Sequence, residues 1–211
     1  MPFNLIDKQW IPVRRKSGKR QEWIAPCEIV DANDPPIALD AVRPDFNGAL
    51  IQFLIGLVQT AFAPKDDGTW RKYLKTPPTA AQLEEALLQF KDAFNLDEGK
   101  FKFMQDPAPP ATGKKATDRT YPIEMLLPTM PQKQTKEHNR DHFAKREHVE
   151  ALCPACAAAA LYSVQSSAPG GGSGHYSSLR GAGSITTLVA GSGLWETVWL
   201  NVLTKDKFLS D

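Results

Sequence analysis

Two cysteines separated by two residues are the clearest candidates for chemistry in this sequence. They are Cys153 and Cys156, in the order Cys-Pro-Ala-Cys, and this spacing lets two thiolates bind one zinc ion, which takes four tetrahedral ligands. A lone third thiol, Cys27, and the pair His138 and His142 could complete such a site. Two alternatives remain open: a redox pair whose thiol pKa is lowered at a helix N-terminus, and two small buried residues at a helix start.

A glycine-rich segment follows the cysteines and predicts close approach of the backbone to a ligand. Its central residues are Gly170, Gly171, Gly172, Ser173 and Gly174. Residues without a Cβ let backbone N–H groups reach phosphates or base edges. No Gly-Lys-Ser or Gly-Lys-Thr follows, so this is not a nucleotide-binding Walker motif. The alternative is a flexible hairpin or linker.

A basic stretch precedes the cysteines, between Lys133 and His148. It contains Phe143, Lys145 and Arg146, and basic residues with an interleaved aromatic ring suit a phosphate backbone and one stacked base. Acidic residues are mixed in, so a solvated polar loop is the alternative. We find no set of residues typical of a catalytic centre.

These residues must be positioned by a mixture of strands and helices, which predicts an α+β fold with an N-terminal β-hairpin, several amphipathic helices and small sheets. The hairpin joins 10–15 to 20–24, with Gly18 at a positive-φ turn position. A helix with apolar residues at helical spacing runs from a cap at Asp45 to about Phe62. A second helix, capped by Thr79, extends to about Phe94.

The second half of the chain predicts shorter elements around the candidate residues. We expect a short helix at 122–127, a long mobile loop at about 129–149, and an alanine-rich helix from Glu150 to about Val164. Residues 185–190 predict a strand, and 194–203 a final helix or strand. No internal repeat is present.

Composition narrows the class of protein. With 25 Lys and Arg against 24 Asp and Glu, the net charge is +1 and indicates no partner. The longest apolar stretch, 49–63, is too short and too polar to span a bilayer, and the first residues lack the pattern of a secretory signal. Three cysteines suit a reducing compartment, so we expect a cytoplasmic protein.

Four segments, taken together and in order, resemble one known family. They are FNLIDKQWIPVR, ALCPACAAAALYSVQSSAPGGGSG, SLRGAGSITTLVAG and LNVLT. The sequence is similar to CasA, the large subunit of the type I-E CRISPR surveillance complex Cascade. The resemblance covers residues 3 to about 204, which we interpret as the N-terminal domain (1–204) of that family; its C-terminal four-helix bundle is not in this sequence.

The resemblance implies a non-enzymatic antiviral defence role. The family helps to recognise the protospacer-adjacent motif, a short signal in double-stranded DNA, and supports strand opening while a guide RNA reads the remaining sequence. The implied partners are other Cascade subunits, the 5′ end of the guide RNA, target DNA and a separate helicase-nuclease.

The resemblance also assigns roles to the candidate residues. It places the glycine segment, Gly170 to Gly174, at the minor groove of the motif duplex. Phe143, Lys145 and Arg146 fall in a loop that docks on a neighbouring subunit and the guide RNA. Cys153 and Cys156 become half of a four-cysteine zinc site whose other ligands lie outside this sequence. The alternative function is a zinc- or thiol-dependent enzyme that uses the same two cysteines.

Overall fold

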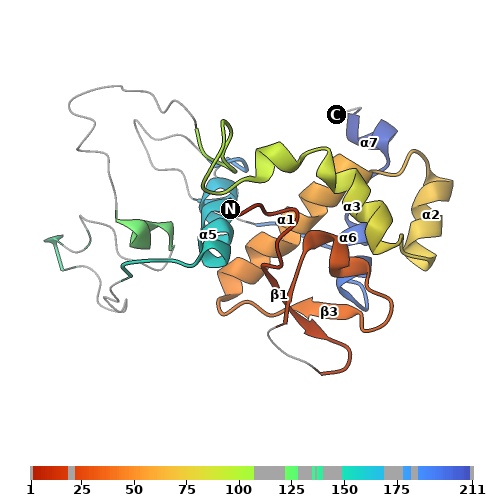
Figure 1. Cartoon of the computed structure of the whole chain (residues 1–211), viewed down its shortest axis with the longest axis horizontal. Coiled ribbons are helices and arrows are strands. Elements are labelled where there is room, and N and C mark those ends of the chain that lie inside the picture. The colour runs from red at the N-terminus through yellow and green to blue at the C-terminus, as the bar shows by residue number, and fades with distance from the viewer. Residues whose placement is uncertain are drawn as a thin grey trace. The chain divides into compact units, whose positions relative to one another are not determined.

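The computed structural model describes residues 2–18, 22–106, 122–127, 135, 137–139, 149–168, 178–181 and 185–209 (Figure 1). The chain divides into two compact units. The first contains the residues up to Gln105 together with those from Ile185 onward, and the second contains residues 106–184. Among the described residues, no helix is both long enough and apolar enough to cross a membrane.

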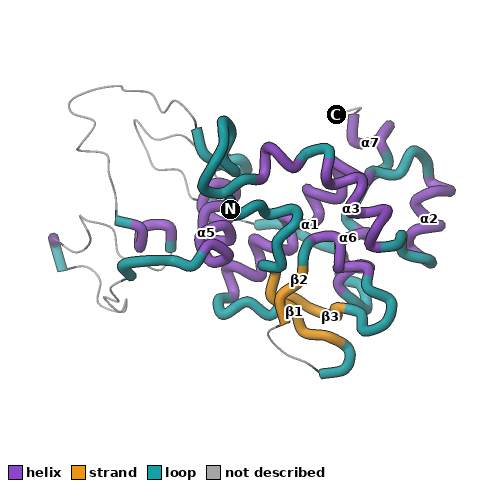
Figure 2. The backbone as a smooth tube through the Cα atoms, in the orientation of Figure 1, coloured by secondary structure: helices purple, strands orange, loops and turns teal. Residues whose placement is uncertain are grey.

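The first unit contains a three-stranded antiparallel sheet in the order β2-β1-β3 (Figure 2). Its strands are β1 (Ile11–Arg15), β2 (Glu22–Ile24) and β3 (Pro36–Leu39). The predicted hairpin is confirmed, and Gly18 has the expected positive φ of 88°. The sequence patterns missed β3, which begins with a proline at an edge of the sheet, one of the few strand positions that proline tolerates.

A buried arginine at the end of β1 ties the sheet to the segment that leads into β3. Arg15 donates from Nε to the carboxylate of Glu22, and from Nη1 to Asp31 at 2.7 Å and to the carbonyl oxygen of Asp34 at 2.6 Å. Its side chain is only 8% exposed. A buried guanidinium needs such charge-assisted partners, so these contacts fix the turn before β3.

The long helix α1 (Pro44–Phe62) is the predicted amphipathic helix. Its apolar face is buried against α3 (Ala80–Leu88), α6 (Leu194–Leu200) and β3. The predicted cap is wrong: the helix begins at Pro44, after Arg43, and Asp45 lies inside the first turn, where it pairs with Arg43 Nε at 3.0 Å. Proline is favoured at the first position because that N–H has no helical partner anyway.

The helix α3 (Ala80–Leu88) confirms the predicted cap but not the predicted length. Thr79 Oγ1 accepts from the backbone N–H of Gln82 at 3.2 Å, and Gln82 Oε1 accepts from the backbone N–H of Thr79 at 2.9 Å. These two bonds form a capping box. The chain then turns into a separate 3-10 helix, η2 (Lys91–Phe94). This break lets the ring of Phe94 stack with that of Phe103 at 5.5 Å.

The first unit also contains η1 (Pro26–Val30) and α7 (Lys205–Leu209). Three tryptophans join α2 (Asp67–Lys75) to α6 (Leu194–Leu200) and to the segment that follows α6. Trp70 Nε1 donates to Val202 O at 2.9 Å, Trp195 Nε1 to Tyr73 O at 3.0 Å, and Trp199 Nε1 to Trp70 O at 2.8 Å. Each indole N–H thus finds a backbone carbonyl on a segment far away in sequence.

The predicted strand at 185–190 is wrong. Its residues have no ladder partners in the described part of the chain, and Ile185 is 91% exposed. The side chain of Asn201 takes the place of a neighbouring strand: Val189 N donates to its Oδ1 at 2.9 Å, and its Nδ2 donates to Val189 O at 2.8 Å. The predicted final element is confirmed as the helix α6.

The second unit is described through two helices. The 3-10 helix η4 (Ile123–Leu126) corresponds to the predicted short helix, and α5 (Pro154–Ser167) to the alanine-rich helix. The start of α5 differs from the prediction by four residues because Cys153, not Glu150, is the residue before the first turn. Most of the predicted loop at 129–149 lies outside the described residues.

Two glutamines on α1 test the contribution of buried hydrogen bonds to this fold. Gln59, only 8% exposed, pairs with the backbone of Leu203: its Nε2 donates to the carbonyl oxygen at 3.1 Å, and its Oε1 accepts from the N–H at 2.7 Å. Gln52 lies two turns earlier, and its Oε1 is buried without a hydrogen-bond partner among the described residues. Loss of the Gln59 amide would therefore leave the buried backbone groups of Leu203 without partners, whereas loss of the Gln52 Oε1 would break no hydrogen bond of that atom.

We predict that Gln59→Leu lowers the free energy of unfolding by about 2 kcal/mol, because it leaves the buried N–H and carbonyl of Leu203 without partners. Gln52→Leu, the matched control, should change it by less than about 0.5 kcal/mol, because no hydrogen bond of its Oε1 is lost. Urea denaturation followed by tryptophan fluorescence measures both. Equal effects of the two substitutions would contradict the assigned role of Gln59.

Candidate functional site

The predicted cysteine pair lies at the N-terminus of α5. Cys153 is the capping residue, and its Sγ accepts a hydrogen bond from the backbone N–H of Cys156 at 3.3 Å. Pro154 occupies the first helical position, where its fixed φ suits the helix. Cys153 is exposed and Cys156 is partly buried. The local sequence therefore holds both thiols on the first turn of one helix.

The fold disfavours the thiolate form of Cys156, the second thiol of the pair. Burial, reinforced by the hydrogen bond and the charge of Cys153, raises the pKa of Cys156 to about 11. A thiol with this pKa is almost entirely protonated near neutral pH, and a protonated thiol is a poor nucleophile. A bound metal ion would remove the proton outright, so the raised pKa does not oppose metal binding.

No further metal ligand is grouped with the pair among the residues that the structure describes. Among the described residues there is no group of three or more His, Cys, Asp and Glu side chains that could hold a metal ion. Cys27 is buried in η1 of the first unit, and burial together with nearby Glu84 and Glu28 raises its pKa to about 11. His142 lies outside the described residues. Cys153 and Cys156 could thus supply two of the four ligands that zinc requires.

The two ends of the glycine-rich segment lie at the same end of α5. Residues 169–177, with Gly170 to Gly174, are outside the described residues. Ala168 ends the helix before them, and after them Leu179 N donates to Gln165 O, in the last turn of α5, at 2.9 Å. A turn with Gly181 at a φ of 63° follows. The described residues on either side of the segment therefore both lie at the C-terminal end of α5.

Arg180 lies in this turn and is exposed. Its charge acts on Tyr162 of α5, where it partly offsets the increase in the pKa of the phenol that burial causes. The predicted basic stretch cannot be placed in the same way, because Phe143, Lys145 and Arg146 all lie outside the described residues.

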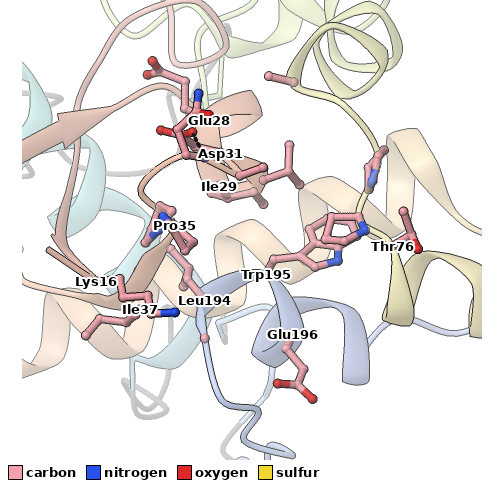
Figure 3. Close-up of a pocket in the computed structure, with 18 of the residues that line it drawn as sticks. Lys16, Glu28, Ile29, Asp31, Pro35, Ile37, Thr76, Leu194, Trp195 and Glu196 are labelled. Atoms are coloured by element: carbon pink, nitrogen blue, oxygen red, sulfur yellow. Dashed lines mark hydrogen bonds between the residues drawn. The ribbon is translucent and has the colours of Figure 1, made fainter.

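The sequence patterns missed a groove on the first unit. It is lined by η1, the start of β3, the connection between α2 and α3, and the start of α6 (Figure 3). These segments are distant in sequence, so no single motif indicates the groove. The one local signal is the pair of diprolyl sequences, 35–36 and 77–78, each of which favours an extended, exposed backbone.

The fold and the thiol pair define an α+β protein in which a glycine-rich loop and a CxxC pair flank one helix. A family model described as CRISPR-associated protein Cse1 matches residues 4–210, so the chain belongs to this family. The resemblance noted in the sequence is thereby confirmed.

Solved structures agree on the fold. The chain is similar to Cse1 from Acidimicrobium ferrooxidans with a TM-score of 0.72 and 22% identity over 98% of this chain and 39% of that one. It is similar to Thermus thermophilus CasA (Cse1) with a TM-score of 0.67 and 24% identity over 95% of this chain and 39% of that one. A chain of a CRISPR RNA-guided surveillance complex matches with a TM-score of 0.57 and 14% identity, over 94% and 43%. The chain thus spans about 40% of the length of these relatives.

We predict that alkylation of Cys156 by iodoacetamide becomes about tenfold faster per pH unit from pH 7 to pH 10, because only the thiolate reacts and its pKa is about 11. Tandem mass spectrometry of a Cys27→Ala variant measures this rate, because fragment ions distinguish a label on Cys156 from one on Cys153 and both thiols of the pair are kept. A rate that levels off below pH 8 would show an activated thiol instead.

Proposed function

We propose that this chain acts as a non-catalytic, cytoplasmic subunit of the RNA-guided type I-E CRISPR surveillance complex, Cascade. The observation that carries the proposal is the family match over residues 4–210. The similarity to a chain of a solved CRISPR RNA-guided surveillance complex supports the other Cascade subunits as its partners.

Within that complex, we propose that Gly170 to Gly174 contact the minor groove of the protospacer-adjacent motif in double-stranded DNA. Two features support this role. The flanking residues Ala168 and Leu179 are both hydrogen-bonded to α5, and restraint of the two ends of a binding segment reduces the entropy lost on binding. Exposed Arg180 lies just after it, where a guanidinium can pair with a DNA phosphate.

We propose a separate role for the basic stretch that contains Phe143, Lys145 and Arg146. Its composition suits the 5′ end of the guide RNA, with the ring stacked on a base and the cations paired with phosphates. The family resemblance further supports docking on a neighbouring subunit and recruitment of the helicase-nuclease by the assembled complex.

We propose that Cys153 and Cys156 bind zinc together with two ligands from outside the described residues. Both thiols lie on the first turn of α5, and such a site would fix the start of the helix whose other end holds the glycine-rich loop. The alternative, a thiol-dependent enzyme, receives no support from the raised pKa of Cys156.

The DNA contact predicts that Gly170→Asp and Gly172→Asp weaken binding of motif-bearing duplex to the assembled complex by about tenfold or more, because a carboxylate meets the DNA backbone where N–H groups would bind. Gly48→Asp in α1, an exposed site with open space around it, is the matched control. Fluorescence anisotropy at fixed salt, with and without the motif, gives the affinities. Unchanged affinity in both loop variants would refute the contact.

The zinc proposal predicts that the assembled complex carries one zinc ion per copy of this subunit and that Cys153→Ser removes it, because a hydroxyl is a far weaker zinc ligand than a thiolate. Cys27→Ala should retain the metal. Elemental analysis by mass spectrometry measures the content. Zinc that survives in Cys153→Ser would exclude this pair as the site.

A further inference from the structure

The two cysteines at the start of α5, the helix of the second unit that is labelled in Figure 1, contact each other. The backbone N–H of Cys156 donates to Cys153 Sγ at 3.3 Å, and the thiol of Cys156 is hydrogen-bonded to Cys153 as well. Cys153 is exposed and Cys156 is partly buried, whereas the third cysteine, Cys27, is buried in the first unit. The chain therefore holds two adjacent thiols, one of which is open to solvent.

The backbone of the first turn suits a bond between the two sulfur atoms. Ala157 N donates to Cys153 O at 2.8 Å, so Cys153 lies on the path of the helix. Positions three apart on an α-helix have Cα atoms about 5 Å from each other. This separation lies within the range of about 4.4–6.8 Å that disulfides require. Rotation of the two side chains can therefore close the bond without a movement of the backbone.

The surroundings of Cys153 favour attack by its sulfur on an electrophile. The first turn of α5 contains no acidic residue. The N–H of Cys156 points at Cys153 Sγ, where it can stabilise the negative charge that the sulfur carries as it attacks. An accessible thiol beside a second cysteine that can resolve its oxidised form is the arrangement found in redox-sensing pairs.

We propose that Cys153 and Cys156 are a redox-sensitive modification site that hydrogen peroxide converts reversibly into an intrahelical disulfide. Cys153 Sγ attacks one oxygen of the peroxide, and the O–O bond breaks. The sulfur keeps a hydroxyl group as sulfenic acid, and the other oxygen leaves as water with the thiol proton. Cys156 Sγ then attacks Cys153 Sγ, and the hydroxyl leaves as a second water with the proton of Cys156. The two thiols lose two electrons, which the peroxide takes up.

The difference in burial assigns the order of these steps. Cys153 is the exposed thiol, so it meets the peroxide first, and Cys156 lies beside it as the resolving thiol. Capture of the sulfenic acid by Cys156 prevents further, irreversible oxidation to sulfinic acid. A small dithiol reverses the change by thiol–disulfide exchange, which returns both thiols and leaves the reductant as a disulfide.

The proposal concerns the metal-free pair and does not rest on the proposed zinc site. A disulfide and a zinc ion would use the same two sulfur atoms, so the two states exclude each other. The experiment is carried out after treatment with a chelator, so that a failure of the zinc proposal leaves its result unaffected.

The experiment exposes the full chain with the substitution Cys27→Ala to hydrogen peroxide. Remaining thiols are then alkylated with iodoacetamide, and tryptic peptides are analysed by tandem mass spectrometry. We expect the peptide that contains both cysteines to lose two hydrogen atoms and to carry no label, because its sulfurs are joined. Dithiothreitol, a small dithiol, should restore labelling of both residues.

Two matched variants of the same Cys27→Ala chain separate the roles of the thiols. Cys156→Ser should stop at the sulfenic acid of Cys153, which dimedone traps as a covalent adduct, and without dimedone it should go on to sulfinic acid. Cys153→Ser should lose its remaining thiol about tenfold more slowly than Cys156→Ser does, because Cys156 is partly buried. A merely structural role of the pair would not produce this difference in rate.

Three results would overturn the proposal: sulfinic or sulfonic acid on Cys153 without a disulfide, a disulfide that joins two chains, or equal rates of thiol loss in the two serine variants. Circular dichroism shows whether each variant is folded. If a serine variant fails to fold, the peptide analysis of the Cys27→Ala chain decides, because that chain keeps both thiols of the pair.

Discussion

The first unit depends on one constraint: a buried polar group must find a hydrogen-bond partner. Four side chains meet it by reaching across the sequence, namely Gln59 and the tryptophans at 70, 195 and 199. Each bond joins residues 44–75 to residues 194–203, which are more than a hundred positions apart in the chain. These bonds hold α6 against α1 and α2, and α6 in turn forms part of the floor of the groove. The apolar periodicity of α1 explains its burial, whereas these bonds explain what it is buried against.

The sequence predicted elements whose cause is local. The hairpin follows from the turn residue Gly18, α1 from its apolar spacing, and the start of α3 from the hydroxyl of Thr79. The failures have non-local causes. Residues 185–190 have a strand-like composition, but Val189 makes its backbone hydrogen bonds with the side chain of Asn201 and not with a neighbouring strand. The helix α2 escaped prediction because it buries no residue completely and depends on its contacts with α6.

In the candidate site, too, features with a local cause were predicted and features with a non-local cause were not. A local pattern placed Cys153 and Cys156 at a helix N-terminus, and the structure agrees. Their protonation could not be predicted, because the pKa of Cys156 depends mainly on how deeply the fold buries the thiol. The groove could not be predicted from the sequence, because its lining comes from four segments that are distant in the chain. In the sequence, Ile37 and Trp195 have the pattern of ordinary core residues.

The division of the first unit into two stretches of sequence has a consequence for biosynthesis. Residues 106–184 separate the two stretches, so at about 5–20 residues per second a ribosome needs about 4–16 s to make the intervening residues. Throughout that time the end of α1 near Phe62 lacks Trp199, its later ring neighbour at 6.3 Å. The nascent chain therefore exposes the aromatic ring of Phe62, which can associate with other apolar surfaces, after α1 has been synthesised. Synonymous codons that slow translation between residues 106 and 184 would lengthen this exposure and increase the demand on chaperones.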